Sequence, residues 1–140
     1  MKREIIITSD GSSTIHLPEW NEQYHSKHGA IQEAIHVFIK SGLSLFSNQK
    51  INILEIGFGT GLNSFITYLE APKMNLEVNY VGIEAYPISS EEVESLNYVD
   101  ELNAIKFKNV FNEMHIQDWE VENPISSKFS SYKYSKYFFT

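Results

Sequence analysis

The chain has 140 residues, of which 42% are hydrophobic and 14% aromatic, a composition that suits one folded domain with a buried core. Its 11 basic and 18 acidic residues give a formal net charge of −7, which argues against general affinity for nucleic acid but not against a local basic patch. There is no cysteine, which excludes disulfides and thiolate zinc sites and is compatible with the cytosol. We expect a cytoplasmic location and no metal centre. No run approaches the ~18 apolar residues of a membrane helix, so no membrane contact is expected.

Residues 1–18 predict a β-hairpin. Two apolar stretches, 4–8 and 13–17, flank an Asp-Gly pair that begins at Asp10. Such a pair is typical of a tight turn between antiparallel strands. We therefore expect a hairpin ahead of the main sheet of the domain.

The next part of the chain predicts a loop followed by a helix. Residues 19–29 are polar and aromatic and indicate a loop or a short helix. Residues 30–41 predict an amphipathic helix, because apolar residues recur at helical spacing. Ser26 is a candidate N-cap, since a serine hydroxyl can accept a hydrogen bond from a free N–H of the first turn. The apolar stripe of the helix consists of Ile31, Ala34, Ile35, Phe38 and Ile39.

Residues 51–56 predict a buried strand that runs into a glycine-rich turn. The strand is mostly apolar, as expected of a central parallel strand covered on both faces. Gly57, Gly59 and Gly61 follow at a spacing of two, and glycine permits both a positive φ and a close approach of the backbone to a ligand. With a helix expected over 62–70, this strand–turn–helix unit is typical of a nucleoside-cofactor site.

A second strand, residues 78–83, ends at Glu84. A carboxylate at the end of this strand can accept hydrogen bonds from both hydroxyls of a ribose. The dinucleotide fingerprint requires glycine where this chain has Leu62, and a pyrophosphate needs free N–H groups at a helix N-terminus. The pattern therefore favours S-adenosylmethionine, which has no phosphate, over a dinucleotide. A purely structural turn is the other alternative.

The remainder of the chain predicts two helices and a further strand. Ser89 and Glu92 have the spacing of a capping box, so a helix is expected from residue 89 to about residue 102. Residues 109–119 predict another short helix. Aromatic residues recur from residue 128 onward and predict a third strand. They are Phe129, Tyr132, Tyr134, Tyr137 and Phe138.

Several stretches resemble one enzyme family. Residues 8–43, 53–64, 114–119 and 129–133 are similar to the tRNA 5-methylaminomethyl-2-thiouridine methyltransferases, which occur alone or fused to an FAD-dependent oxidase. The block at 19–43 is the specific part of the resemblance. The glycine-rich stretch by itself resembles motif I, which many class I methyltransferases share.

The resemblance implies a methyl transfer from S-adenosylmethionine to the aminomethyl group of the wobble uridine in tRNA, with an FAD-dependent oxidase acting upstream. It also implies the residues that hold the cofactor, namely Glu55, Gly57, Gly59, Gly61 and Glu84. The family takes a proton-handling carboxylate from an Asp-Ala-Phe-x-Pro motif, which is absent from this chain. Candidates on the acceptor side are Tyr24, His25 and Glu33, with Ser26 beside them, and loop packing or solvation is the alternative for each.

We therefore expect an α/β fold of the class I S-adenosylmethionine-dependent, Rossmann-like type, incomplete and preceded by a β-hairpin. The expected organisation is one partial methyltransferase domain over 1–140, with the hairpin at 1–18, the family-specific loop and helix at 19–43, and the first half of the sheet domain at 44–140. The missing motif predicts an inactive N-terminal fragment, truncated at its C-terminus. A methyltransferase for a small molecule or protein, and a non-catalytic binding remnant of the fold, are the alternatives.

Overall fold

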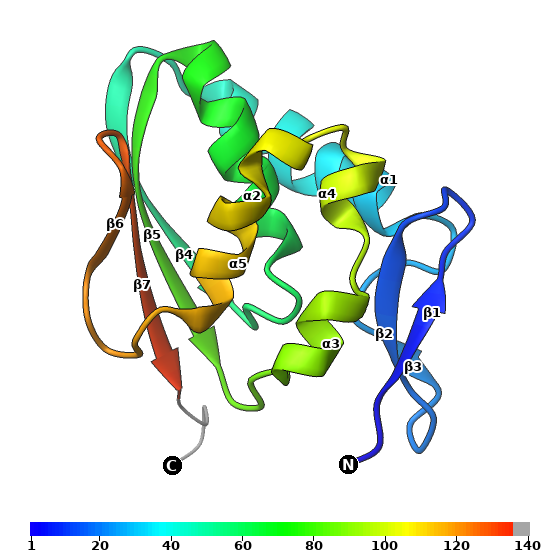
Figure 1. The fold of residues 1–140 in the computed structure, drawn as a ribbon. Coiled ribbons are helices and arrows are strands. Elements are labelled where there is room, and N and C mark those ends of the chain that lie inside the picture. The colour runs from blue at the N-terminus through cyan, green and yellow to red at the C-terminus, as the bar shows by residue number, and fades with distance from the viewer. Residues whose placement is uncertain (136–140) are drawn as a thin grey trace.

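The computed structural model describes residues 1–135 and contains two β-sheets with helices packed between and beside them (Figure 1). One sheet has the strand order β1-β2-β3 and the other the order β4-β5-β7-β6. The strands are β1 (Glu4–Ile7), β2 (Ser13–Leu17), β3 (Glu22–Gln23), β4 (Gln49–Ile56), β5 (Leu76–Glu84), β6 (Asn123–Ser126) and β7 (Phe129–Ser135). The α-helices are α1 (Ala30–Ala34), α2 (Leu62–Glu70), α3 (Ser90–Ser95), α4 (Tyr98–Glu101) and α5 (Lys108–Ile116).

The larger sheet is parallel in its first three strands, and this confirms the predicted mixed α/β class. β4 pairs with β5, and β5 pairs with β7, so the carboxyl ends of all three strands lie at one edge of the sheet. The strands predicted at 51–56, at 78–83 and from residue 128 are all present. β6, which pairs antiparallel with β7, was not predicted. Tyr137 and Phe138, which were expected to continue the last strand, lie outside the described residues.

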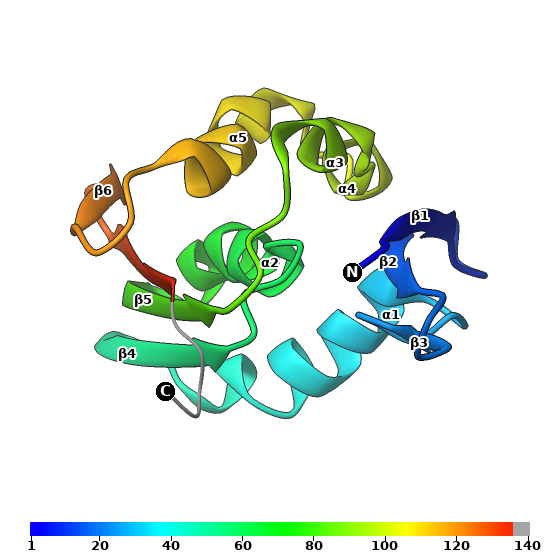
Figure 2. The same cartoon turned by 90° about the horizontal axis from the view of Figure 1, so that it is seen from below.

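The core lies between the sheet and helices α2 and α5, which cover one face (Figure 2). Tyr80 of β5 is fully buried on that face, and the rings of Phe65 and Phe111 meet edge to face with their centroids 5.2 Å apart. The opposite face carries exposed apolar side chains at the end of β4, with Leu54 61% and Ile56 60% exposed. The prediction that this strand is central and covered on both faces is therefore wrong for residues 1–135, because β4 lies at the edge of the sheet and helices cover only one of its faces.

The N-terminal hairpin is confirmed, and it caps the first helix. The strands β1 and β2 pair as predicted, and β3 adds a short third strand. The first N–H groups of α1, at residues 30–32, donate to Thr8 Oγ1, Ser12 Oγ and Asp10 Oδ2 at 3.1, 3.1 and 2.9 Å. These three side chains lie in the turn of the hairpin and satisfy donors that have no partner inside a helix.

The prediction that Ser26 is the N-cap is wrong. The helix begins one residue after Gly29, and the hairpin has already satisfied its first donors. Ser26 Oγ instead accepts from the backbone N–H of His28 at 3.2 Å, within the preceding loop. The cap therefore comes from a distant segment of the chain, which local sequence spacing does not reveal.

Two predicted helices are altered by the fold. The helix expected at 30–41 is α-helical only as far as Ala34 and continues as a π-helical segment, Ile35–Lys40. The helix expected at 89–102 is divided into α3 and α4, because the Asn97 side chain bonds to the hairpin. Its Oδ1 accepts from Ser13 N at 2.7 Å and its Nδ2 donates to Gly11 O at 2.9 Å. In residues 1–135, no helix is long and apolar enough to cross a membrane.

Candidate cofactor site

The glycine-rich loop leaves the carboxyl end of β4 and is fixed to the neighbouring strand. Gly57, Gly59 and Gly61 all have positive φ, at +84°, +57° and +76°. The N–H groups of Gly57 and Phe58 both donate to Ile83 O of β5, at 2.8 and 3.0 Å. Since L-residues rarely adopt this left-handed backbone, the three glycines permit a turn that side-chain-bearing residues would resist.

A cavity of about 580 Å³ lies beside this loop. Its other walls come from the N-terminal sheet and its following loop and from α1 with the π-helical segment. Seven residues singled out from the sequence line the cavity together: Tyr24, His25, Glu33, Glu55, Gly57, Gly59 and Glu84. Gly61 does not line it, and an added Cβ there would lie 2.8 Å from His115 Nε2. The role of Gly61 in the structure is to let the chain enter α2 close to that histidine.

Glu84 connects the glycine loop with the segment that follows β5. Its Oε2 accepts from Gly59 N at 2.7 Å, and its Oε1 accepts from Tyr86 N at 3.0 Å. The carboxylate therefore holds the glycine loop against the segment that follows β5. Each carboxylate oxygen has more than one lone pair, so Glu84 retains capacity to accept bonds from a ligand hydroxyl.

Glu55 is the one residue of β4 that is buried, and it carries a carboxyl group. Its oxygens accept from Tyr80 Oη at 2.9 Å and from Asn63 Nδ2 at 2.7 Å. Burial raises the pKa of Glu55 from 4.5 to about 7, and the nearby charge of Glu84 acts in the same direction, while the two hydrogen bonds oppose it. A cation placed beside Glu55 would favour its ionised form.

The acceptor-side candidates lie on the opposite wall. A Cβ at Gly59 would approach Tyr24 Cδ2 to 3.2 Å, so the tyrosine ring faces the loop closely. His25 Nδ1 and Thr14 Oγ1 are hydrogen-bonded at 2.8 Å, and burial lowers the pKa of His25, against the opposing effect of Glu33. Glu33 Oε2 accepts from the N–H of Ser26 at 3.1 Å. All three cavity residues thus have structural contacts as well as access to the cavity.

The acidic side chains that line the cavity have no lysine or arginine among them in residues 1–135. These acidic side chains are Glu33, Glu55 and Glu84. A pyrophosphate requires cationic or N–H donors in excess, and this lining presents carboxylates instead. The cavity therefore suits a ligand with positive charge and free hydroxyl groups better than a phosphorylated one.

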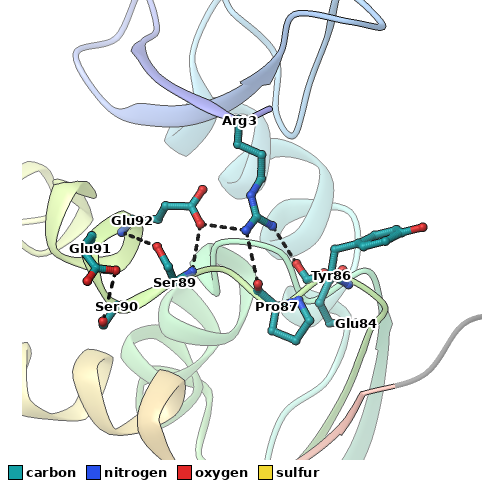
Figure 3. Close-up of polar contacts among 8 residues, drawn as sticks. All are labelled: Arg3, Glu84, Tyr86, Pro87, Ser89, Ser90, Glu91 and Glu92. Carbon is teal, nitrogen blue, oxygen red and sulfur yellow. Dashed lines mark hydrogen bonds and ion pairs between the residues drawn. The ribbon is translucent and has the colours of Figure 1, made fainter. Parts of the chain in front are cut away.

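No sequence pattern indicated Arg3, which ties the N-terminal segment to the chain that follows β5 (Figure 3). Its guanidinium donates to Tyr86 O at 3.0 Å and forms an ion pair with Glu92 Oε1 at 2.8 Å. Glu92 also completes the predicted capping box, because Oε1 accepts from Ser89 N at 2.9 Å. Since Arg3 is more than 80 positions from these partners, no local spacing could have indicated the contact.

No family model matches the chain. It is 37% identical over 99 residues to the tRNA 5-methylaminomethyl-2-thiouridine biosynthesis bifunctional protein MnmC of Leptospira interrogans, a match that covers 63% of this chain and 15% of that protein. The MnmC protein of Cupriavidus metallidurans is 32% identical over 100 residues, which is 67% of this chain and 15% of that protein. The chain thus spans only about 15% of the length of these curated relatives.

The structure of MNMC2 from Aquifex aeolicus is similar over 94% of this chain and 42% of the solved chain, with a TM-score of 0.71 and 24% identity. The fold is therefore the mixed α/β fold with a parallel sheet seen in that protein. The structural match shows the fold alone, whereas the sequence matches show that this chain is homologous to MnmC. The resemblance found in the sequence is confirmed at this level.

Proposed function

We propose that this chain binds S-adenosylmethionine in the cavity between the glycine loop and the N-terminal sheet, as the cofactor-binding part of a methyltransferase. The observation that carries the proposal is the joint placement of Gly59, Glu55 and Glu84 around a cavity whose described lining has no lysine or arginine. S-adenosylmethionine supplies an electrophilic methyl group on a sulfonium centre. It carries a net positive charge, ribose hydroxyls and an ammonium group, and no phosphate.

Each of these residues has a distinct part in the proposal. The backbone at Gly57 and Gly59 lets the ligand approach closely, because no Cβ occupies that side of the loop. Glu84 accepts bonds from ribose hydroxyls while it continues to hold Gly59 N. Glu55 faces the ammonium group, and this cation lowers the high pKa of its carboxyl group and favours ionisation.

We propose an amine on tRNA as the methyl acceptor, because the MnmC relatives carry tRNA 5-methylaminomethyl-2-thiouridine biosynthesis in their name. The wobble uridine with an aminomethyl group, produced by an FAD-dependent oxidase, fits this chemistry, and the reaction belongs in the cytoplasm. The amine must be neutral and lie in line with the methyl group to react. Tyr24, His25 and Glu33 form the wall that would receive it. Burial lowers the pKa of His25 and so favours its neutral form.

The excess of acidic residues in the chain favours an alternative methyl acceptor, a small amine. A net charge of −7 and a cavity with three glutamates suit a small cationic amine at least as well as an RNA. A binding assay separates the two. Anticodon stem-loops with and without the aminomethyl group, titrated into the S-adenosylmethionine-loaded chain, should bind with a preference for the modified form. Equal and negligible binding of both would favour the small-molecule acceptor.

The cofactor is tested by calorimetric titration with S-adenosylmethionine and, in parallel, with NAD⁺. We expect one-site binding of S-adenosylmethionine and no measurable binding of NAD⁺, whose pyrophosphate would face the glutamates. Tighter binding of NAD⁺ would reverse the choice of cofactor. No binding of either ligand to the folded chain would leave the glycine loop as a structural turn and reject the proposal.

A further inference from the structure

The glycine loop is bonded to helices α4 and α5 as well as to Glu84 of β5. Its two non-glycine residues, Phe58 and Thr60, are only 5% and 1% exposed. Thr60 accepts two hydrogen bonds from side chains of helices outside the loop. Its carbonyl accepts from His115 Nε2 of α5 at 2.9 Å, and its Oγ1 accepts from Tyr98 Oη of α4 at 3.1 Å. The backbone of the loop therefore depends on α4 and α5, far along the chain.

The bond from His115 defines the state of its ring. A carbonyl oxygen can only accept, so the proton of the neutral imidazole lies on Nε2. Burial lowers the pKa of His115 to about 4, with Lys133 acting in the same direction, so the ring is neutral at physiological pH. His115 is thus a fixed neutral donor and not a proton carrier in this pH range.

The ring of His115 also fits the shape of the loop. It meets the Phe58 ring edge to face with centroids 5.7 Å apart, and it occupies the space that a Cβ at Gly61 would need. Contacts at positions 58, 60 and 61 place one side chain against most of the turn.

Lys133 in turn holds His115. Its Nζ donates to His115 O at 3.0 Å, in the last turn of α5, where a cation is favoured by the free carbonyls. The same Nζ lies 4.4 Å from the centroid of the Trp119 ring and 5.4 Å from that of Phe58. Lys133 is 1% exposed, so this cation is enclosed by the aromatic rings and the helix end.

We propose that His115 is a positioning residue for the cofactor loop, held in place by Lys133. Glycine-rich turns have many accessible conformations, and a ligand that must order the loop loses affinity. The bond to the Thr60 carbonyl fixes the Thr60–Gly61 peptide plane before any ligand arrives. This inference rests on the proposed function only where it concerns affinity, because the ordering of the loop is a property of the ligand-free chain.

Two variants of the whole chain separate the hydrogen bond from the bulk of the ring. His115→Leu removes the donor and keeps an apolar side chain, whereas His115→Gln keeps an N–H donor at a similar reach. His36→Leu on the exposed side of the π-helical segment is the matched control. Hydrogen exchange of the Gly59 and Gly61 amides is measured without ligand, and affinity for S-adenosylmethionine is measured by calorimetry.

We expect His115→Leu to speed exchange at both amides about tenfold and to weaken binding about tenfold, the effect of losing one buried hydrogen bond. His115→Gln should stay within about twofold of the parent in both measurements, as should His36→Leu. Should the leucine variant not fold, His115→Asn replaces it, because its shorter amide places the donor away from the Thr60 carbonyl.

Two results would overturn the proposal. One is unchanged exchange and affinity in the variant that lacks the donor, and the other is an equal loss in His115→Gln, which would assign the effect to the ring alone. If the parent chain binds no S-adenosylmethionine, the proposed function fails. The exchange rates of the ligand-free variants still decide whether His115 positions the loop.

Discussion

Phe58 of the glycine loop packs directly on Gly82 of β5, and a Cβ at position 82 would lie 2.7 Å from Phe58 Cδ2. This contact connects β5, near its carboxyl end, to the loop that enters the cavity. Phe58 cannot move inward, because its ring also meets His115. The position of the loop is therefore set in part by the absence of one side chain on the strand beneath it.

Gly82→Ala should displace Phe58 and with it the loop. We expect a loss of stability of about 1–3 kcal/mol, typical of overpacking in a filled core, together with weaker binding of S-adenosylmethionine. Urea denaturation and calorimetry measure the two effects. Val81→Ala, on the neighbouring residue of β5, serves as the control and should leave the affinity unchanged. Equal affinities of Gly82→Ala and the parent would mean that Phe58 does not position the loop.

Glu84→Gln should weaken cofactor binding and leave the fold intact. The carboxylate now accepts from Gly59 N and Tyr86 N, and an amide has one acceptor oxygen and turns a donor toward the other N–H. Loss of a charge-assisted acceptor corresponds to about 1.5–3 kcal/mol. Calorimetry measures the affinity, and the exposed Glu94→Gln is the matched control. Should the two variants bind alike, Glu84 has only a structural role.

Glu55 should make stability depend on pH. Its pKa rises from 4.5 to about 7 on folding, so the folded chain binds the proton more tightly than the unfolded chain. This contribution to stability is complete below pH 4.5 and is lost as the pH rises to about 7, with a total of up to about 3 kcal/mol. Glu55→Gln should remove the dependence.

The measurement is urea denaturation of Glu55→Gln and the parent between pH 4.5 and 8, with attention to the difference between them. The free energy of unfolding of the variant, relative to that of the parent, should increase as the pH rises through this window. A constant difference at every pH would contradict the raised pKa of Glu55. Ligand binding provides a second check. If the ammonium group of S-adenosylmethionine favours the ionised carboxylate, binding near pH 7 should release protons from Glu55.

The 140 residues, purified alone, should transfer no methyl group to tRNA that bears the aminomethyl wobble base. They lack the Asp-Ala-Phe-x-Pro motif that the resemblance assigns to proton handling. Within residues 1–135, β4 is paired on one side only, so that flank of the cavity has no further strand. A misplacement of about an ångström can cost ~100-fold in rate. A radiolabelled-methyl assay decides this, and turnover comparable to that of a longer MnmC protein would show that residues 1–140 suffice for the reaction.

Sequence patterns predicted the parts of the fold that depend on local order. The apolar run before Gly57 and the acid at Glu84 were sufficient for two strands and the loop, because strand, turn and helix signals are all contained in short windows. The third strand followed from alternating aromatic residues. β6 was missed, since it is short and includes Pro124, which is tolerated at the edge of a sheet but weakens the pattern.

Long-range contacts explain the remaining errors. Asn97 divides a helix because its amide bonds to the hairpin, and Ser26 is not a cap because Thr8 reaches the helix first. At the site, the sequence indicated seven of the residues that line the cavity but not Arg3 or His115, which act from other elements. Their residue types are common on protein surfaces, and only the fold brings them to the loop.

The cavity beside the glycine loop is proposed above as the S-adenosylmethionine site. The most direct measurement is the ¹⁵N–¹H correlation spectrum of the chain with and without S-adenosylmethionine. We expect the largest changes at the amides of Gly57, Gly59, Glu84 and Tyr86. Gly59→Val should abolish them by filling the space between the loop and Tyr24. An unchanged spectrum of the folded chain, or changes confined to residues remote from this loop, would contradict this proposal.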